Sequence, residues 1–324
     1  MAPSTVPERY SQQKALAAAL DAANAASKLL LTRFELSRGR ALKQWMKSPG
    51  ALVTDADIES DRVIAETLRK HGVPGRILSE ERASGGPDDG LSWLIDPLCG
   101  TYPFSTGMVH WGVNIALRRG GQFEVAALAL PALGETLAMS RGKGVTRNGR
   151  PWLPDSSSSM VSVPSPSTGE RQGEGASIGT RIRRAAPPPR VPRSARDDAA
   201  ARAVPFATAK LSDVSIGLEI DGGETWRRLM RRGLGWVPQC AQVNTFASAA
   251  YPLGLTCLGR LSALVIYGVE PVHMAAGAAI ALELGLRVTD ATGGRIDWRG
   301  DGELPVVVAG WPEVHAQLIR AMRA

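Results

Sequence analysis

The chain has few cysteines, few aromatic residues and no long apolar run. Its 324 residues include three cysteines, Cys99, Cys240 and Cys257, whose spacing forms neither a zinc-type pair nor an even disulfide framework. No stretch approaches the roughly 18 consecutive apolar residues of a membrane span, and the first residues lack the apolar centre of a signal peptide. These absences exclude a disulfide framework and a membrane-spanning helix, and they predict a cytoplasmic protein with free thiols.

Acidic residues are outnumbered, 31 against 38 lysines and arginines, which gives a net charge of +7. Part of the excess lies in two arginine-rich stretches, residues 181–196 and 227–232. No recognisable nucleic-acid-binding module accompanies them, so we expect a solvated basic surface rather than a nucleic-acid or membrane partner. The hydrophobic fraction of 44% and the charged fraction of 21% are typical of a globular protein with a sizeable core.

Helical and strand-like patterns alternate along the chain, which predicts an α/β protein. Apolar residues at helical spacing predict helices over residues 11–36, 57–70, 273–284 and 313–323. Short apolar runs predict buried strands at residues 76–78, 93–95, 113–117, 125–130, 211–220 and 306–309. Residues 248–253 and 261–267 also have the composition of ordered structure, and Asn148-Gly149 predicts a tight turn.

These patterns divide the chain into three parts. Residues 1–154 form a predicted N-terminal α+β lobe, and residues 206–324 form a predicted C-terminal α/β lobe. Between them, residues 155–205 are rich in Pro, Ser and Arg and poor in large apolar side chains. Such a segment buries too little surface to offset its ordering entropy, so we predict a flexible surface insertion.

Several motifs, in order, resemble those of the inositol monophosphatase family. Residues 93–104, WLIDPLCGTYPF, are similar to the family signature W-x-x-D-P-I/L-D-G-T-x-N-F without a gap. Upstream, residues 79–81 resemble the family's G-E-E and residues 53–57 its V-T-x-x-D element. Downstream, residues 270–277 resemble the second signature x-P-W-D-x-A-A-G, and residues 246–250 resemble G-S-A-A.

The resemblance implies a layered αβαβα sandwich that hydrolyses phosphate monoesters with magnesium. By position, Glu80, Asp96 and the Leu98 carbonyl match ligands of the first metal ion, and Asp96 also matches a bridging ligand to the second. The other ligands of the second ion fall on Cys99 and His273, where the family has Asp. Neutral imidazole and thiol groups are poor replacements for carboxylates around Mg²⁺, so we expect a weakened metal site.

Three further positions carry roles by the same resemblance. Thr101 matches the residue that orients the attacking water, and Asp57 lies near the position of its acidic neighbour. The amides of Gly100 and Thr101 match the start of the helix that cradles the phosphate. Pro103 and Val272 depart from the Asn and the Trp of the two signatures.

The joint replacement by Cys99 and His273 suggests a second chemistry. The family fold would place both side chains around one metal position, and a thiol beside an imidazole can form a thiolate nucleophile. Asp96 would orient His273, and the Gly100 and Thr101 amides would serve as an oxyanion hole. The hypothesis is acyl-type hydrolysis, transfer or cyclisation on a small molecule, as in secondary metabolism, with no cofactor required.

Alternative hypotheses remain open at this point. In one alternative, the chain is a metal-dependent phosphomonoesterase that acts on a sugar or inositol phosphate, with Mg²⁺ at a residual site. In another, it is a non-catalytic pseudophosphatase. Asp96, Cys99 and His273 could also form a zinc or iron site, which we favour less. Because the family resemblance suggests a homodimer, we expect one here. The remaining histidines and cysteines are assigned structural roles: His71, His110, His315, Cys240 and Cys257.

Overall fold

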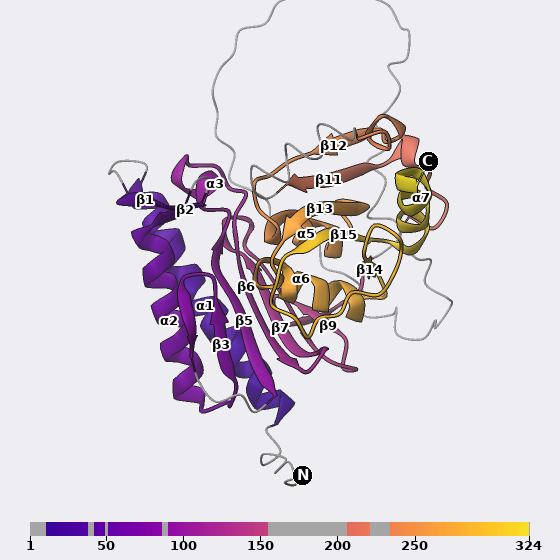
Figure 1. The fold of residues 1–324 in the computed structure, drawn as a ribbon. Helices are drawn as coiled ribbons and strands as arrows, with labels where there is room; N and C mark the ends of the chain where they lie inside the picture. The colour runs from indigo at the N-terminus through magenta and orange to yellow at the C-terminus, as the bar shows by residue number, and fades with distance from the viewer. Residues whose placement is uncertain are drawn as a thin grey trace, which may run out of the picture.

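The computed structural model describes residues 11–37, 42–48, 51–85, 90–154, 206–220 and 234–323. These residues build alternating layers of helix and sheet (Figure 1), which confirms the predicted αβαβα sandwich. The proposed insertion at residues 155–205 and the arginine-rich stretch at 227–232 lie outside the described residues. No helix within the described ranges is long and apolar enough to cross a membrane.

The first layer consists of two long helices, α1 (Gln12–Ser37) and α2 (Asp55–His71). A short hairpin of β1 (Gln44–Ser48) and β2 (Ala51–Thr54) connects them. Thr54 caps α2 through a capping box with Asp57, and Gly72 ends the helix in the left-handed conformation at φ 60°. The helix therefore starts two residues before the predicted Asp57, which is its third residue rather than its first.

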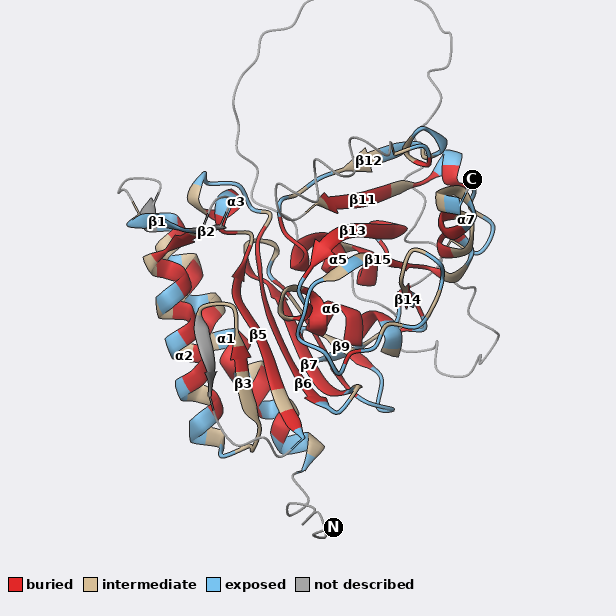
Figure 2. Cartoon of the chain, in the orientation of Figure 1, coloured by how far each residue is buried: buried red, intermediate tan, exposed pale blue. Residues whose placement is uncertain are grey.

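The second layer is an eight-stranded sheet in the order β10-β9-β8-β7-β6-β5-β3-β4. Its strands are β3 (Arg76–Ser79), β4 (Arg82–Gly85), β5 (Leu91–Cys99), β6 (Gly112–Arg119), β7 (Gln122–Leu130), β8 (Glu135–Ser140), β9 (Val145–Arg147) and β10 (Arg150–Trp152). The central strands are covered on both faces (Figure 2), which is why they read as continuous apolar runs. Asn148 and Gly149 form the predicted turn, with φ 49° and 75°.

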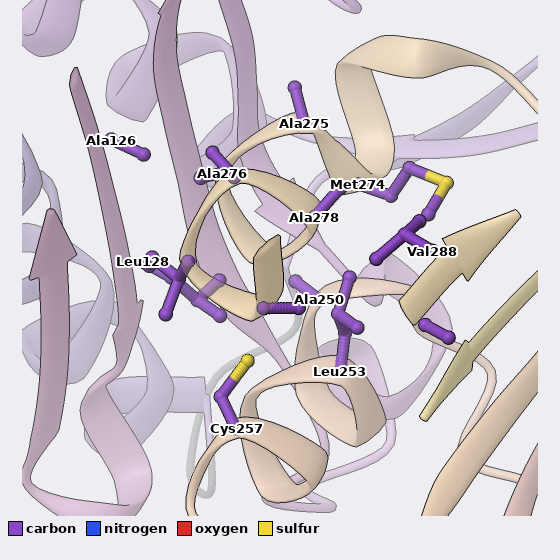
Figure 3. Close-up of a cluster of buried hydrophobic side chains, with 14 of the residues drawn as sticks. Ala126, Leu128, Ala250, Leu253, Cys257, Met274, Ala275, Ala276, Ala278 and Val288 are labelled. Atoms are coloured by element: carbon purple, nitrogen blue, oxygen red, sulfur yellow. The ribbon is translucent and has the colours of Figure 1, made fainter. Parts of the chain in front are cut away.

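The third layer, α5 (Ala250–Cys257) and α6 (Pro271–Glu283), packs between the two sheets. Small residues let the helices approach each other closely. A Cβ added at Gly277 would lie 2.5 Å from Leu253 Cδ2. Figure 3 shows Cys257 within this apolar cluster, so the prediction of a core role for Cys257 is confirmed.

A five-stranded sheet in the order β12-β11-β13-β15-β14 forms the fourth layer, and α7 (Pro312–Arg323) covers its outer face. The strands are β11 (Ser215–Ile220), β12 (Gln242–Asn244), β13 (Ala263–Val269), β14 (Arg287–Thr289) and β15 (Leu304–Gly310). The strand predicted at 211–220 begins instead with a 3-10 turn, Leu211–Asp213. Helix α6 lies against β5, β6 and β7 of the large sheet (Figure 1).

Candidate metal centre

Two acidic residues lie side by side on neighbouring parallel segments of the large sheet. β3 pairs with β5 in parallel so that Ser79 lies beside Ile95; Glu80 directly follows β3, and Asp96 is the next residue within β5. The Glu80 amide donates to the Ile95 carbonyl at 3.2 Å, which extends the pairing by one step. Because carboxyl ends of parallel strands meet at one edge, the register brings these two carboxylates together.

Asn114 brings α6 to the same place. It lies on β6 directly opposite Asp96, it is fully buried, and its Nδ2 donates to the Val272 carbonyl at 2.5 Å. Its Oδ1 accepts from the amides of Ala276 at 2.9 Å and Gly277 at 3.3 Å. A single amide side chain thus fixes the first turn of α6 against the strand that carries Asp96. The sequence interpretation missed Asn114, although an Asn inside the apolar run of residues 112–117 was an available signal.

His273 on that first turn completes a three-residue cluster. Its Nδ1 lies 2.8 Å from Asp96 Oδ2 and 3.8 Å from Glu80 Oε2. One ligand atom from each of Glu80, Asp96 and His273 lies within 4.8 Å of the other two. The Asp96 side chain is 1% exposed, whereas that of His273 is 18% exposed. The cluster therefore has a buried floor and a side that solvent can reach.

Several acidic side chains gather around this cluster, and their ionisation is suppressed. Burial, and then the charge of Asp96, raise the pKa of Glu80 to about 9. Burial is also the main cause of the raised pKa values of Glu81 and Asp57, and Asp96 contributes to both. Lys47 from the β1–β2 hairpin forms an ion pair with Glu81 and lies 3.9 Å from Glu80.

Two basic groups, Lys47 and His273, therefore lie among four acidic side chains, which are costly to ionise together without a further cation. The four acidic side chains are those of Asp57, Glu80, Glu81 and Asp96. A further cation at the cluster would offset the charge of the ionised carboxylates and lower the cost of ionising Glu80. Two carboxylates and one imidazole are an ordinary donor set for a divalent ion, so these residues fit a metal ion.

Asp57 and Thr101 are joined beside the cluster. Thr101 Oγ1 donates to Asp57 Oδ1 at 2.8 Å and lies 3.4 Å from the Leu98 carbonyl. The other carboxylate oxygen of Asp57 accepts from the Thr54 amide at 2.8 Å within the capping box. Gly100 precedes the short helix α3 (Thr101–Ser105) at φ 107°, where a Cβ would lie 2.7 Å from the His110 carbonyl. That position requires glycine because both the φ angle and the space exclude a side chain.

Cys99 also lies beside residue 273, but the recorded contact is to the backbone. Its Sγ lies 3.8 Å from the His273 carbonyl oxygen, 3.2 Å from the Ala250 amide and 3.5 Å from Ser248 Oγ. Burial, and then the Asp96 charge, raise the pKa of the Cys99 thiol well above its ordinary value. This environment favours the neutral thiol, whereas a nucleophile needs the thiolate.

The other histidines lie away from the cluster. His71 pairs with Asp21 at 2.9 Å, and His315 Nε2 lies 2.8 Å from Thr289 Oγ1. His110 packs against Phe246 and Tyr251, with ring centroids 5.3 and 5.0 Å away. Each therefore has a packing or pairing partner that accounts for its position.

Comparison with known proteins gives one consistent result. The protein-family model of the inositol monophosphatase family matches residues 11–324. The Nus factor SuhB of Escherichia coli K12 is 26% identical over 306 residues, covering 94% of each chain. The crystal structure of the suhB protein from Bartonella henselae superposes with a TM-score of 0.71 at 21% identity, covering 95% of this chain and 98% of that one.

A third match corrects the cofactor prediction. An IMPase/NADP phosphatase structure complexed with Mg²⁺ and phosphate superposes with a TM-score of 0.62 at 14% identity, covering 92% of this chain and 91% of that one. Together with the family match, it contradicts the expectation that no cofactor is required. The physical reason is the excess of buried carboxylates described above. The loss of two acidic ligands at Cys99 and His273 does not remove it.

Proposed function

Because this chain belongs to the inositol monophosphatase family, we propose that it is a metal-dependent phosphomonoesterase that acts on a small phosphorylated alcohol such as a sugar phosphate. The observation that carries this proposal is the cluster of Glu80, Asp96 and His273, whose ligand atoms lie within 4.8 Å of one another among largely buried acidic side chains. Such a cluster favours a divalent cation, and a phosphate ester needs one to offset its own charge.

The retained residues divide the work of hydrolysis. Glu80, Asp96 and the Leu98 carbonyl would hold the ion, which when bound supplies Lewis-acid polarisation of the phosphoryl oxygens. Thr101 donates to Asp57, so the lone pairs of its hydroxyl oxygen remain available to accept a hydrogen bond from water. Thr101 therefore orients the water, and Asp57 is the nearby carboxylate that can take its proton.

The reaction balances as an ordinary hydrolysis. The water oxygen forms a bond to phosphorus while its proton passes through the Thr101 hydroxyl to Asp57. The bond between phosphorus and the ester oxygen breaks, and the alcohol leaves after it takes a proton from solvent. The amides of Gly100 and Thr101 are placed by the resemblance to bind the phosphate oxygens throughout.

A specific experiment tests this function. Release of inorganic phosphate is measured from a panel of sugar and inositol phosphates with added Mg²⁺ or Mn²⁺. We expect measurable release that falls at least about 100-fold in Glu80→Gln and is unchanged in Glu66→Gln, an exposed glutamate on α2. No release above buffer with any substrate and either ion would contradict the proposal.

The Cys99 and His273 hypothesis makes a different prediction, which thiol alkylation tests. If Cys99 is a nucleophile, alkylation at neutral pH should be fast and should slow sharply in His273→Ala. The recorded contacts of the thiol, a buried backbone carbonyl, an amide and a hydroxyl, favour slow labelling instead. We therefore rank acyl-type chemistry below phosphate hydrolysis.

A non-catalytic role is the second candidate. The SuhB relative from Escherichia coli K12 carries the name Nus factor, which names no hydrolytic activity, and it is similar to this chain over 94% of its length. This candidate predicts no phosphate release and no loss of biological output when Glu80 is replaced. A growth or expression phenotype that Glu80→Gln rescues as well as the natural chain does would favour it.

A further inference from the structure

We propose that His273 is a metal ligand of this chain, and that its imidazole shifts the preference of the site from Mg²⁺ toward ions that accept nitrogen, such as Mn²⁺ and Zn²⁺. We further infer that the site holds one such ion. This inference rests on the proposed function only in that both need a cation. It concerns the identity and number of ions rather than the reaction.

The position of the imidazole supports the first part of the proposal, that His273 is a metal ligand. His273 Nδ1 lies 2.8 Å from Asp96 Oδ2 and 3.8 Å from Glu80 Oε2. Ligands around a six-coordinate ion at about 2.1 Å are separated by roughly 3 Å when adjacent and by roughly 4 Å when opposite. His273 Nδ1 and Asp96 Oδ2 are within hydrogen-bond distance, and the ligand atoms of all three side chains lie within 4.8 Å of one another. The three side chains can therefore reach one ion without a change of element or register.

The support behind the ring makes this position stable. Asn114 holds the Val272 carbonyl and the amides of Ala276 and Gly277, so the turn that carries His273 is tied to β6 on both sides of the ring. Because Asn114 lies opposite Asp96 in the ladder, the same strand pair sets the distance between the imidazole and the carboxylate. A ligand held by buried hydrogen bonds of this kind is preorganised for an ion.

The contacts of Cys99 support the second part of the proposal, that the site holds one ion. By the family resemblance, this residue stands where a second ion has an acidic ligand. Here the sulfur accepts the Ala250 amide at 3.2 Å and the Ser248 hydroxyl at 3.5 Å, and it faces the His273 carbonyl at 3.8 Å. A sulfur atom held by these hydrogen bonds in the contact between β5 and α5 is not available to bind a second ion. The donor set that remains serves one ion.

The chemistry of the donors sets the selectivity. Mg²⁺ demands oxygen ligands in near-ideal octahedral array, whereas imidazole suits transition ions and Zn²⁺. Replacing an acidic ligand by His273 removes a negative charge, which weakens Mg²⁺ binding, and adds a nitrogen donor, which compensates only for ions that bind nitrogen well. The expected result is a reversal of the metal preference that three carboxylates would give.

The test measures binding without turnover. Mn²⁺, Zn²⁺ and Mg²⁺ are titrated separately into the full-length, metal-free protein by calorimetry, and the Mn²⁺ complex is examined by pulsed electron paramagnetic resonance for coupling to imidazole ¹⁴N. We expect one ion per chain, Mn²⁺ affinity at least about tenfold above Mg²⁺ affinity, and a clear ¹⁴N coupling. His273→Asp should lose the coupling and reduce the Mn²⁺ to Mg²⁺ affinity ratio at least about tenfold.

His71→Asn is the matched control, because His71 lies at the far end of α2 and pairs with Asp21. It should keep the coupling and the affinity ratio. Two ions per chain, Mg²⁺ binding as tight as Mn²⁺, or ¹⁴N coupling that persists in His273→Asp would overturn the inference. Phosphate release with Mg²⁺ and no ¹⁴N coupling would leave the phosphatase proposal intact and sink this one. Coupling to imidazole ¹⁴N without any phosphate release would support this inference and contradict the phosphatase proposal.

Discussion

The two halves of the candidate metal centre have different origins in the fold. The carboxylate half, Glu80, Asp96 and the Leu98 carbonyl, lies on or directly after β3 and β5 within one sheet. The substituted half combines Cys99, the last residue of β5, with His273 on α6. Strand register fixes the first half, whereas the second is completed by contacts between layers. Residues of the second half can therefore change chemistry without disturbing the first.

The replacements fit their new surroundings in different ways. The thiol of Cys99 is smaller and less polar than a carboxylate, and it lies in an apolar core cluster with Ser248 and Ala250 as hydrogen-bonding neighbours. His273 stays partly exposed and keeps polar contact with Asp96 and Glu80. One replacement has become part of the packing, and the other has remained part of the site.

The largest expected effect tests the carboxylate half through its neighbour Thr101. Thr101→Val keeps the shape of the side chain but removes the hydroxyl that joins Asp57 to the proposed water. We expect kcat to fall about 100-fold with KM nearly unchanged, because general acid–base assistance is worth roughly this much. Thr101→Ser should restore most of the rate. Equal activity of the Val and Ser variants in a phosphate-release assay would break the assigned role.

The next effect tests how the two halves are joined. Asn114→Leu leaves the Val272 carbonyl and two helix amides without their buried partner, which should cost about 2–3 kcal/mol of unfolding free energy. The turn that carries His273 should loosen as well, so Mn²⁺ affinity should fall even at low temperature, where the variant is folded. Urea unfolding and calorimetry measure the two effects. Unchanged Mn²⁺ affinity in a folded variant would show that the halves are held together by other contacts.

Cys99→Ala addresses the substituted half directly. If the thiol only packs, hydrolysis should stay within about threefold of the natural rate while the unfolding free energy falls by about 1–2 kcal/mol. Cys257→Ala is the matched control, because Cys257 is equally buried and lies in the same apolar cluster. Phosphate release and urea unfolding of the two variants give the comparison. Loss of all activity in Cys99→Ala alone would return the nucleophile hypothesis to first place.

Sequence patterns predicted much of the fold because its inner layers are strongly apolar. The runs at residues 113–117 and 125–130 lie within β6 and β7, and the Ala-rich stretch at 273–284 overlaps α6. The apolar pattern missed β8, whose polar and apolar residues are mixed, and α3 was expected only from the family resemblance because it is a single short turn. Such elements depend on neighbouring strands and backbone geometry rather than on their own composition.

The motifs named residues that the structure brings together, but not the orientation of their side chains. Glu80 and Asp96, which the motifs assign to one metal ion, lie side by side because they follow paired residues of adjacent parallel strands. The motifs could not show that the Cys99 sulfur faces the backbone carbonyl of residue 273, since that depends on how Ser248 and Ala250 approach from another layer. Contacts between layers are set by tertiary packing, about which a local motif carries no information.

The smallest expected effect concerns the loss of unfolding free energy as the pH falls. His315 is another histidine of the C-terminal layers, and burial, with a contribution from Arg287, lowers its pKa to about 4. The folded protein therefore binds its proton less readily than the unfolded chain does. This stabilising term is fully present above the unfolded pKa of 6.5 and is lost as the pH falls from there toward 4. Between pH 7.5 and 6 we expect a loss of about 1 kcal/mol.

His315→Gln should remove this slope, because glutamine does not titrate. Urea unfolding at both pH values measures it, and the difference between the natural chain and the variant gives the contribution of His315 alone. Parallel pH profiles for the natural chain and His315→Gln would mean that His315 does not titrate differently on folding.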